Sequence, residues 1–234
     1  IRLWMKQNYL KLNDGKTEFL ILCTSSERKK LTKSSIKIGD EQITASNSAR
    51  NIGAIFDSEM NMKPHVNSIC QACYYHIRNI GRVRSHLTQD AAIKLVHAFI
   101  SSKLDHMNAL LYGIPKYMIS KLQKIQNNAA RIVSKSRRRD HITPILKTLH
   151  WLPIESRIKF KIILTSFKAL YGLAPGYILD LINIHQLSHA LRSTNLSLLK
   201  QPFSKDKYGD RSFRVCAPPP VEQATTSHKA KFRS

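Results

Sequence analysis

The spacing of apolar residues changes near residue 58, and this change divides the chain into two kinds of structure. Before it, short β-rich runs alternate with polar turns, which is typical of strands. After it, apolar residues recur every three or four positions from Met62 to Ile80, the spacing of one helix face. We therefore predict an α+β fold: a small antiparallel β region, a mainly α-helical bundle and a loose C-terminal tail.

Turn residues delimit the predicted elements of the first part. Residues 4–12 read as the end of a helix, which Asn13, Asp14 and Gly15 then stop. Residues 17–23 read as a strand with Phe19, Ile21 and Cys23 on one face. Residues 36–38 and 43–44 flank a turn at 39–41 and predict a hairpin, and a third run spans 51–56.

Caps and apolar periods predict six helices in the second part. Thr88 is a good N-cap, with Asp90 in the first turn. Gly172 stands where a helix over 155–171 would need a left-handed residue. The remaining helices are expected from about 61, 115, 143 and 175, and the chain after about 191 reads as irregular or disordered.

The charge of the chain is strongly one-sided. Its 38 Lys and Arg oppose 15 Asp and Glu, giving a net charge of +23, which indicates a polyanionic partner. Between 121 and 168 only Asp140 and Glu155 oppose twelve cations. These are Lys121, Lys124, Arg131, Lys135, Arg137, Arg138, Arg139, Lys147, Arg157, Lys159, Lys161 and Lys168. Phosphate contacts explain such a pattern; a merely solvated basic surface, or an amphipathic helix at a membrane or on calmodulin, is the alternative.

The cysteines and the hydropathy of the chain bear on its cellular compartment and on membrane association. Four irregularly placed Cys indicate a reducing compartment and no disulfide framework. The expected location is intracellular, in the nucleus and cytoplasm. No run approaches the roughly 18 apolar residues of a membrane span, and no membrane partner is expected.

We predict no metal site. His65, Cys70, Cys73 and His76 have zinc-like spacing, but on one helix Cys73 reads as a core residue. Trp151 is expected in the core.

An ordered series of segments carries a resemblance to a known family. The segments are Trp4, Met5, Asn8 and 10–13; 16–20; Asn51-Ile52-Gly53 and Asp57; His65-Val66; 77–80; Leu104-Asp105, Asn108 and 110–115; Leu122-Gln123, Gln126-Asn127 and 129–131; 141–144, 149–153 and Arg157-Ile158; 168–170, Gly172, Ala174 and Pro175; and 211–213. Together, over roughly 3–218, they resemble the reverse transcriptases of non-LTR (LINE-type) retrotransposons.

The resemblance implies a piece of a polymerase. The family is an RNA-directed DNA polymerase whose paired aspartates hold Mg²⁺. Their aromatic-Ala-Asp-Asp motif would precede Ile1, and the sequence contains no Asp-Asp pair. We therefore expect a fragment that lacks the N-terminal palm and fingers of its parent, needs no cofactor of its own, and is inactive alone as a polymerase. After Ala217-Pro218 the family's Trp-Asn-Leu-Pro-like signature is missing, which suggests a decayed genomic copy.

The resemblance also assigns roles along the chain. It implies a palm remnant over 1–57, a thumb-like region over 58–140, a basic connection region over 141–190 and an irregular tail over 191–234. Lys16 matches a palm lysine proposed to protonate departing pyrophosphate, and is otherwise an ordinary lysine before a strand. Ile52 and Gly53 match the primer-grip hairpin, the alternative being a β-bulge glycine.

The expected partner is template–primer nucleic acid, RNA and DNA. Besides Ile52 and Gly53, the predicted contacts are Arg78, Arg82 and Arg84 at the end of the first thumb-like helix, with Lys124, Arg131, Lys135, Arg137, Arg138, Arg139, Arg157, Lys159 and Lys161. Two alternatives stay open. The chain could be a transposon relic with no selected function, with exposed strand edges that favour aggregation, or a co-opted basic RNA-binding module.

Overall fold

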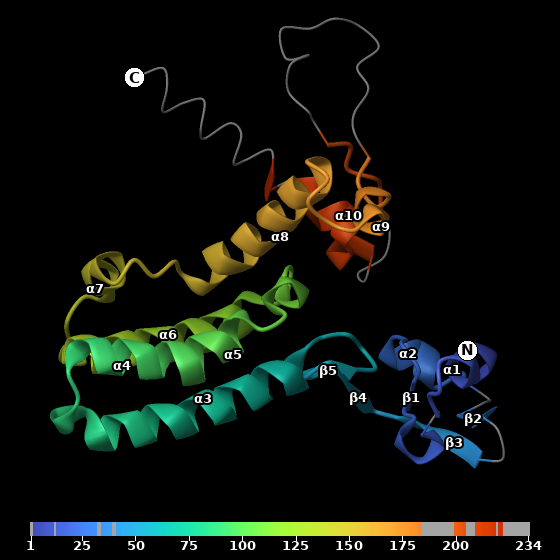
Figure 1. The fold of residues 1–234 in the computed structure, drawn as a ribbon, viewed down its shortest axis with the longest axis horizontal. Coiled ribbons are helices and arrows are strands. Elements are labelled where there is room, and N and C mark those ends of the chain that lie inside the picture. The colour runs from blue at the N-terminus through green and yellow to red at the C-terminus, as the bar shows by residue number, and fades with distance from the viewer. Residues whose placement is uncertain are drawn as a thin grey trace, which may run out of the picture. The chain divides into compact units, whose positions relative to one another are not determined.

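The computed structural model describes residues 2–11, 13–31, 34–38, 41–183, 199–204, 209–218 and 220–221. The chain forms two compact units, Ile1–Ser68 and Ile69–Ser234. The predicted α+β class is confirmed, since small sheets precede a mainly helical region (Figure 1). The four segments predicted from the sequence stay predictions.

The first unit is built from short elements. They are α1 (Arg2–Gln7), the 3₁₀ turn η1 (Asp14–Lys16), β1 (Phe19–Leu20), α2 (Ser25–Arg28), β2 (Ser35–Ile38), β3 (Glu41–Ser46), β4 (Ser48–Asn51) and β5 (Ala54–Asp57). One sheet has the order β1-β3-β2, with β1 parallel and β2 antiparallel to β3. A second sheet pairs β4 with β5 in antiparallel register. The predicted hairpin is therefore confirmed as β2 and β3, and its turn residues 39–40 lie outside the described residues.

Three sequence predictions for this unit were wrong in detail. The first helix ends at Gln7, before residue 12, because Tyr9 has a left-handed backbone with φ of 55°. The strand predicted over 17–23 is only Phe19–Leu20, and a short helix with a Thr24–Glu27 capping box follows it. The run 51–56 is no single strand, because a turn at Ile52-Gly53 separates β4 from β5.

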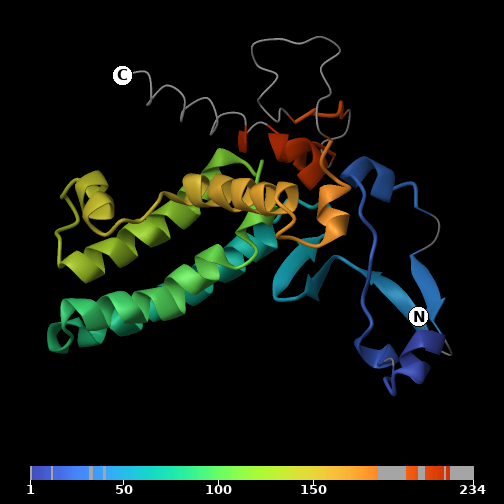
Figure 2. The ribbon, with the colours of Figure 1, turned by 45° about the horizontal axis from the view of Figure 1, so that its top comes forward.

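The second unit is a helical bundle. Helix α3 begins within the last residues of the first unit and continues into the second. Its longer helices are α3 (Lys63–Val83), α4 (Gln89–Val96), α6 (Lys116–Ser134) and α8 (Ile154–Leu170). The shorter elements are η2 (Arg84–His86), the π-helical turn η3 (His97–Ser101), α5 (Ser102–Asp105), η4 (Asn108–Leu111), α7 (Ile142–Thr148), α9 (Gly176–Leu179), η5 (Gly209–Arg211) and α10 (Phe213–Cys216). Figures 1 and 2 show α3, α4 and α6 side by side, with α8 running back along α6.

The helix ends follow the sequence signals. The Thr88 hydroxyl accepts a hydrogen bond from the Ala91 amide at 3.2 Å, which confirms the predicted N-cap. Pro115 and Pro153 precede α6 and α8. Gly172, with φ of +68°, ends α8, and the Leu173 amide donates to the Lys168 carbonyl at 2.7 Å. Local residue chemistry therefore accounts for where these helices begin and end.

The apolar stripes form the core of the second unit. Buried side chains include Cys73, Ile80, Val96, Ile100, Leu122, Ile125, Val133, Ile158 and Ile162. Trp151 is also buried, as expected, with its ring edge-on to His97. These residues recur at helical spacing, and the predicted stripe from Met62 to Ile80 on α3 is confirmed.

Some residues near the end of the chain are described, and they pack on the helices of the second unit. Leu199 is buried with Ala169 and Ile182, and Phe213 and Val221 pack against this cluster. The Arg211 side chain donates to the carbonyls of Tyr112 and Leu110 at 3.1 and 2.9 Å. Apolar burial and these partly buried hydrogen bonds hold the described part of the segment on α8 and η4. Residues 184–198, 205–208 and 222–234 lie outside the described residues.

Candidate nucleic-acid interface

One face of α6 carries cations and no acid. Lys121, Lys124, Arg131 and Lys135, here called the α6 basic strip, are spaced by three, seven and four residues and therefore share one side of the helix. The three lysines are exposed and Arg131 is half-buried. The Lys121 Nζ atom lies 6.0 Å from the centre of the Tyr117 ring, one turn earlier on the same side. Since α6 contains no Asp or Glu, the strip has no counter-charge on its own helix.

The neighbouring helix α3 is also free of acidic residues. Arg78 and Arg82 lie one turn apart and are exposed. Burial raises the pKa of the Cys70 thiol, and the nearby positive charge of Lys121 partly opposes that rise. Arg84, beyond the other end of α3, reaches the last turn of α6. The two helices therefore run side by side in the same direction (Figures 1 and 2).

Arg84 has a structural role instead of the predicted contact with nucleic acid. Its side chain is buried, and its guanidinium donates to the carbonyls of Ile132, Leu87 and Val133 at 2.7, 2.8 and 2.8 Å. The last carbonyls of a helix have no partner within the helix, so Arg84 supplies donors to the end of α6. The prediction that grouped Arg84 with Arg78 and Arg82 is thus corrected, because its donors face protein carbonyls.

The turn after α6 presents three consecutive arginines. Lys135 ends the helix in a left-handed conformation, with φ of 54°. The Asp140 carboxylate accepts from the Arg137 amide at 2.6 Å, and its carbonyl accepts from the Arg131 side chain. This closes a tight loop in which Arg137, Arg138 and Arg139 are all exposed, here called the arginine turn. The tight loop therefore places three exposed arginines directly after the α6 basic strip in the chain.

The predicted cations of α8 differ from those of α6. The Arg157 guanidinium lies 2.6 Å from the Asp105 carboxylate, and Lys159 lies 3.0 Å from Glu155. Lys161 is exposed. Arg157 and Lys159 therefore already have acidic partners, so they offer less charge to a polyanion than the α6 basic strip.

The predicted residues of the first unit lie on its surface. Lys16 is exposed at the end of η1. Ile52 and Gly53 are the two central residues of the β4–β5 hairpin, and both have positive φ, 47° and 85°. This is the two-residue type I′ geometry, so the expectation of a hairpin holds and the bulge alternative is wrong.

Buried thiols and helix composition bear on metals and membranes. Burial raises the pKa of Cys73 to about 12, and Cys73 is fully buried, which confirms it as part of the apolar stripe. Among the described residues, no group of three or more His, Cys, Asp or Glu is arranged to hold a metal ion. That the chain needs no cofactor stays a prediction. Within the same residues, no helix has both the length and the apolar character to cross a bilayer.

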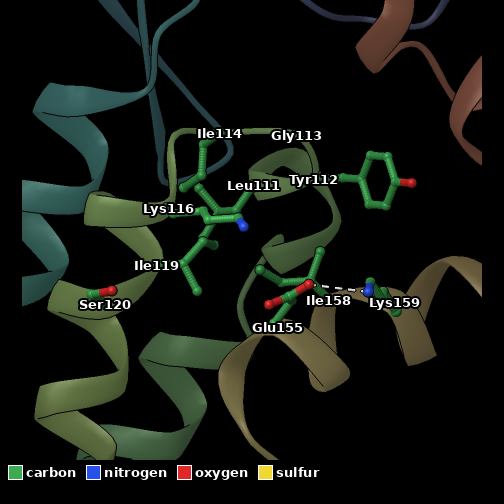
Figure 3. Close-up of a pocket in the computed structure, with 10 residues that line it drawn as sticks. All are labelled: Leu111, Tyr112, Gly113, Ile114, Lys116, Ile119, Ser120, Glu155, Ile158 and Lys159. Carbon is green, nitrogen blue, oxygen red and sulfur yellow. Dashed lines mark ion pairs between the residues drawn. The ribbon is translucent and has the colours of Figure 1, made fainter.

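Two cavities open beside α8. The larger, of about 460 Å³, is lined by η4 and the loop after it, by the first turns of α6 and by Glu155, Ile158 and Lys159 (Figure 3). Its ionic groups include the Glu155–Lys159 pair, drawn dashed in Figure 3. The second, of about 340 Å³, contains the Asn108 amide among its lining groups. Sequence reasoning used Asn108 only as part of a motif and gave it no role.

Comparison of the chain with protein-family models, with curated proteins and with solved structures found no match. The chemistry of the surface is therefore what indicates a function. It consists of two adjacent acid-free helices, an arginine turn and two cavities along α8.

Proposed function

We propose that the chain binds nucleic acid through the α6 basic strip, the arginine turn and the exposed cations of α3. The ligand is an RNA–DNA template–primer hybrid. The protein is then the thumb-like part, with its neighbouring segments, of a LINE-type reverse transcriptase. In that family the polymerisation chemistry and its Mg²⁺ belong to paired aspartates, so the role of this chain is to hold the duplex by its phosphates.

The observation that carries the proposal is the absence of acid from α3 and α6 together. Ordinary protein surfaces intersperse both signs of charge, because a single-sign field is unfavourable unless it attracts a ligand. Here two parallel helices expose only cations and neutral groups. Phosphates that displace counterions from such a surface would supply the binding free energy.

The test is a titration of the full chain with a fluorescent RNA–DNA hybrid over a range of salt concentrations. Log affinity should fall linearly with log salt, with a slope set by the number of phosphates neutralised. The double variant Lys121→Gln/Lys124→Gln should lower the magnitude of this slope by about two, because each phosphate contact contributes roughly one. Affinity should fall by the same factor for every sequence of the hybrid, since phosphate contacts carry no sequence information.

A second double variant, Lys94→Gln/Lys159→Gln, is the matched control. It removes the same charge, but Lys94 and Lys159 pair with Asp90 and Glu155. Its slope should stay that of the unchanged chain. Equal losses in the two double variants would contradict a localised interface, and no binding at moderate salt would contradict nucleic-acid binding altogether. Tighter binding of a structured RNA than of the hybrid would indicate a co-opted RNA-binding module.

A decayed relic is the second candidate, and the first unit favours it. Its exposed apolar side chains include Trp4, Tyr9, Leu10 and Leu22. Such surface promotes association when nothing covers it. Sedimentation of the purified chain distinguishes the two: concentration-dependent aggregation without a cooperative unfolding transition would favour the relic, and a stable, salt-dependent binder would exclude it.

A further inference from the structure

Helix α8 is apolar on two opposite sides. Its buried side packs in the bundle and includes Ile154, Ile158, Ile162 and Ala169. Its other side carries Phe160, Leu164, Phe167 and, at the end of the helix, Tyr171, here called the α8 seam. Phe160, Phe167 and Tyr171 are 53%, 49% and 68% exposed, and Leu164 is half-buried. Because a helix that is apolar all round is normally buried all round, the α8 seam indicates a surface that a partner covers.

The spacing of the α8 seam is that of a coiled coil. Its residues are separated by four, three and four positions, the heptad spacing with which one helix packs along another. The rings of Phe167 and Tyr171 lie 4.4 Å apart, so the seam is continuous across its last turn. From Phe160 to Tyr171 it extends about 17 Å, or about three helical turns. A seam this narrow fits one helix better than a broad apolar surface.

Two lysines border the α8 seam on one side. Lys161 and Lys168 each follow a seam phenylalanine directly and are seven positions apart, so both occupy the same flanking position of the heptad. Both are exposed, and within the described part of the chain neither forms an ion pair. Flanking charges of a coiled coil pair with opposite charges on the facing helix and determine which helix binds. The expected partner therefore carries acidic residues beside its own apolar seam.

The charge of the chain and the width of the seam disfavour other occupants. A second copy would also carry a net charge of +23, and the only acid of α8, Glu155, already pairs with Lys159. A helix that lies on a membrane buries a broad apolar face, whereas the α8 seam is one residue wide in each turn. An acidic amphipathic helix matches both the shape and the charge.

We propose that the α8 seam binds one amphipathic helix of a partner protein, with Asp or Glu of that helix paired to Lys161 and Lys168. Phe160 and Phe167 insert between apolar side chains of the partner, and the two lysines fix its register and orientation. This interaction goes beyond the proposed nucleic-acid binding, because it uses side chains outside the α6 basic strip, the arginine turn and α3.

The test uses a synthetic acidic peptide of about 28 residues, or about four heptads, with Leu at the two seam positions and Glu at the flanking positions. A second peptide has the same composition with its leucines moved off the heptad, so it keeps the charge and loses the seam. Binding to the full chain is followed by fluorescence anisotropy at about 0.15 M salt, which screens long-range attraction. We expect the heptad peptide to bind at least about tenfold more tightly than the second peptide.

The double variant Phe160→Ala/Phe167→Ala should weaken binding of the heptad peptide by about 30-fold or more, because buried aromatic anchors dominate such interfaces. It should leave binding of the RNA–DNA hybrid unchanged. Tyr75→Ala/Phe99→Ala is the matched control, since it removes two exposed rings of the same unit that lie on α3 and η3. Both double variants should keep the unfolding transition of the unchanged chain, because the rings are exposed. Equal losses in the two variants would overturn the proposal.

Charge reversal tests the acidity of the partner. Lys161→Glu/Lys168→Glu should weaken binding of the acidic heptad peptide by about tenfold and strengthen binding of a peptide with Lys at the flanking positions by a similar factor. An unchanged preference for the acidic peptide would overturn the pairing with Lys161 and Lys168. Equal binding of the heptad peptide and its rearranged counterpart would overturn the helix partner. Self-association in sedimentation, or binding to anionic phospholipid vesicles, that is lost in Phe160→Ala/Phe167→Ala would replace it by a second copy or a membrane.

Discussion

The two units differ in what holds them together. Among the described residues of the first unit, the buried apolar side chains are those of Cys23, Ala54, Met62 and Val66. The second unit buries whole stripes of Ile, Leu and Val from four long helices. The first unit therefore depends on backbone pairing, caps and polar side chains, whereas the second depends on apolar burial. Net stability follows buried apolar area, so the second unit should be the more stable.

The difference arises although both units are rich in apolar residues. In the first unit Leu3, Trp4, Tyr9 and Ile52 are largely exposed, because strands of two to six residues offer little surface to cover them. In the second unit, helices of up to 21 residues bring their stripes together. Apolar content alone therefore does not predict a core; the length and packing of the elements do.

The largest expected effect compares the two tryptophans. Trp151 is 7% exposed in the second unit, so Trp151→Ala should lower the free energy of unfolding by about 3–5 kcal/mol. Trp4 is 60% exposed in the first unit, so Trp4→Ala should change the free energy of unfolding by no more than about 0.5 kcal/mol. Urea unfolding followed by circular dichroism measures both. Similar losses in the two variants would contradict the difference between the units.

The next effect concerns a polar contact that organises the first unit. The buried Asp57 carboxylate accepts from the amides of Glu59, Asn61 and Met62 at 3.2, 3.0 and 2.7 Å. Asp57→Asn keeps the shape but turns one acceptor into a donor, so we expect a loss of about 2–3 kcal/mol. Faster amide exchange over 54–62 would report it. Asp90→Asn, at an exposed pair, serves as the control and should change exchange little.

The rate of cysteine alkylation compares how readily the two units expose buried thiols by local unfolding. Burial raises the pKa of Cys73 to about 12 and that of Cys216 to about 11, so near pH 8 both thiols in the second unit stay protonated and unreactive. Cys23, buried in the first unit, should react at least about tenfold faster, because that unit opens more readily. Raising the pH toward 11 should speed alkylation of Cys73 and Cys216.

Mass spectrometry of peptides after timed alkylation measures these rates. The partly exposed Cys70 provides an internal reference on α3. Urea should equalise all four cysteines. If Cys23 were protected as well as Cys73 in the native chain, the first unit would be as stable as the second.

The smallest effect is a stabilisation of the first unit. Ile52 is β-branched and has φ of 47°, a left-handed conformation that strains its side chain. Ile52→Asn creates the Asn-Gly pair that type I′ turns favour, and should stabilise the β4–β5 hairpin by about 0.5–1 kcal/mol. Slower amide exchange in β4 and β5 is the readout. If Ile52 also contacts a primer strand, the same variant should weaken hybrid binding, whereas an unchanged affinity would remove Ile52 from the interface.

The positions and ends of the helices, and the acid-free faces of α3 and α6, were determined by the sequence alone, because caps, periods and charge act over one or two turns. Thr88, Gly172 and the stripes of α6 are examples. The sequence did not determine the strand lengths in the first unit, because a strand needs a partner. The apolar pattern of 17–23 does not show how much of it pairs.

Tertiary structure alone decided which cations are available and where the cavity lies. Arg84 reaches carbonyls 48 and 49 positions away, Arg157 meets Asp105 across 52 positions, and Arg211 reaches Leu110 across 101. The same holds for Asn108, whose unpaired oxygen shows only once α5, η4 and α8 are packed. The sequence specifies the charge of a side chain. Whether that charge pairs with protein groups or is available to a ligand depends on partners that folding brings from distant parts of the chain.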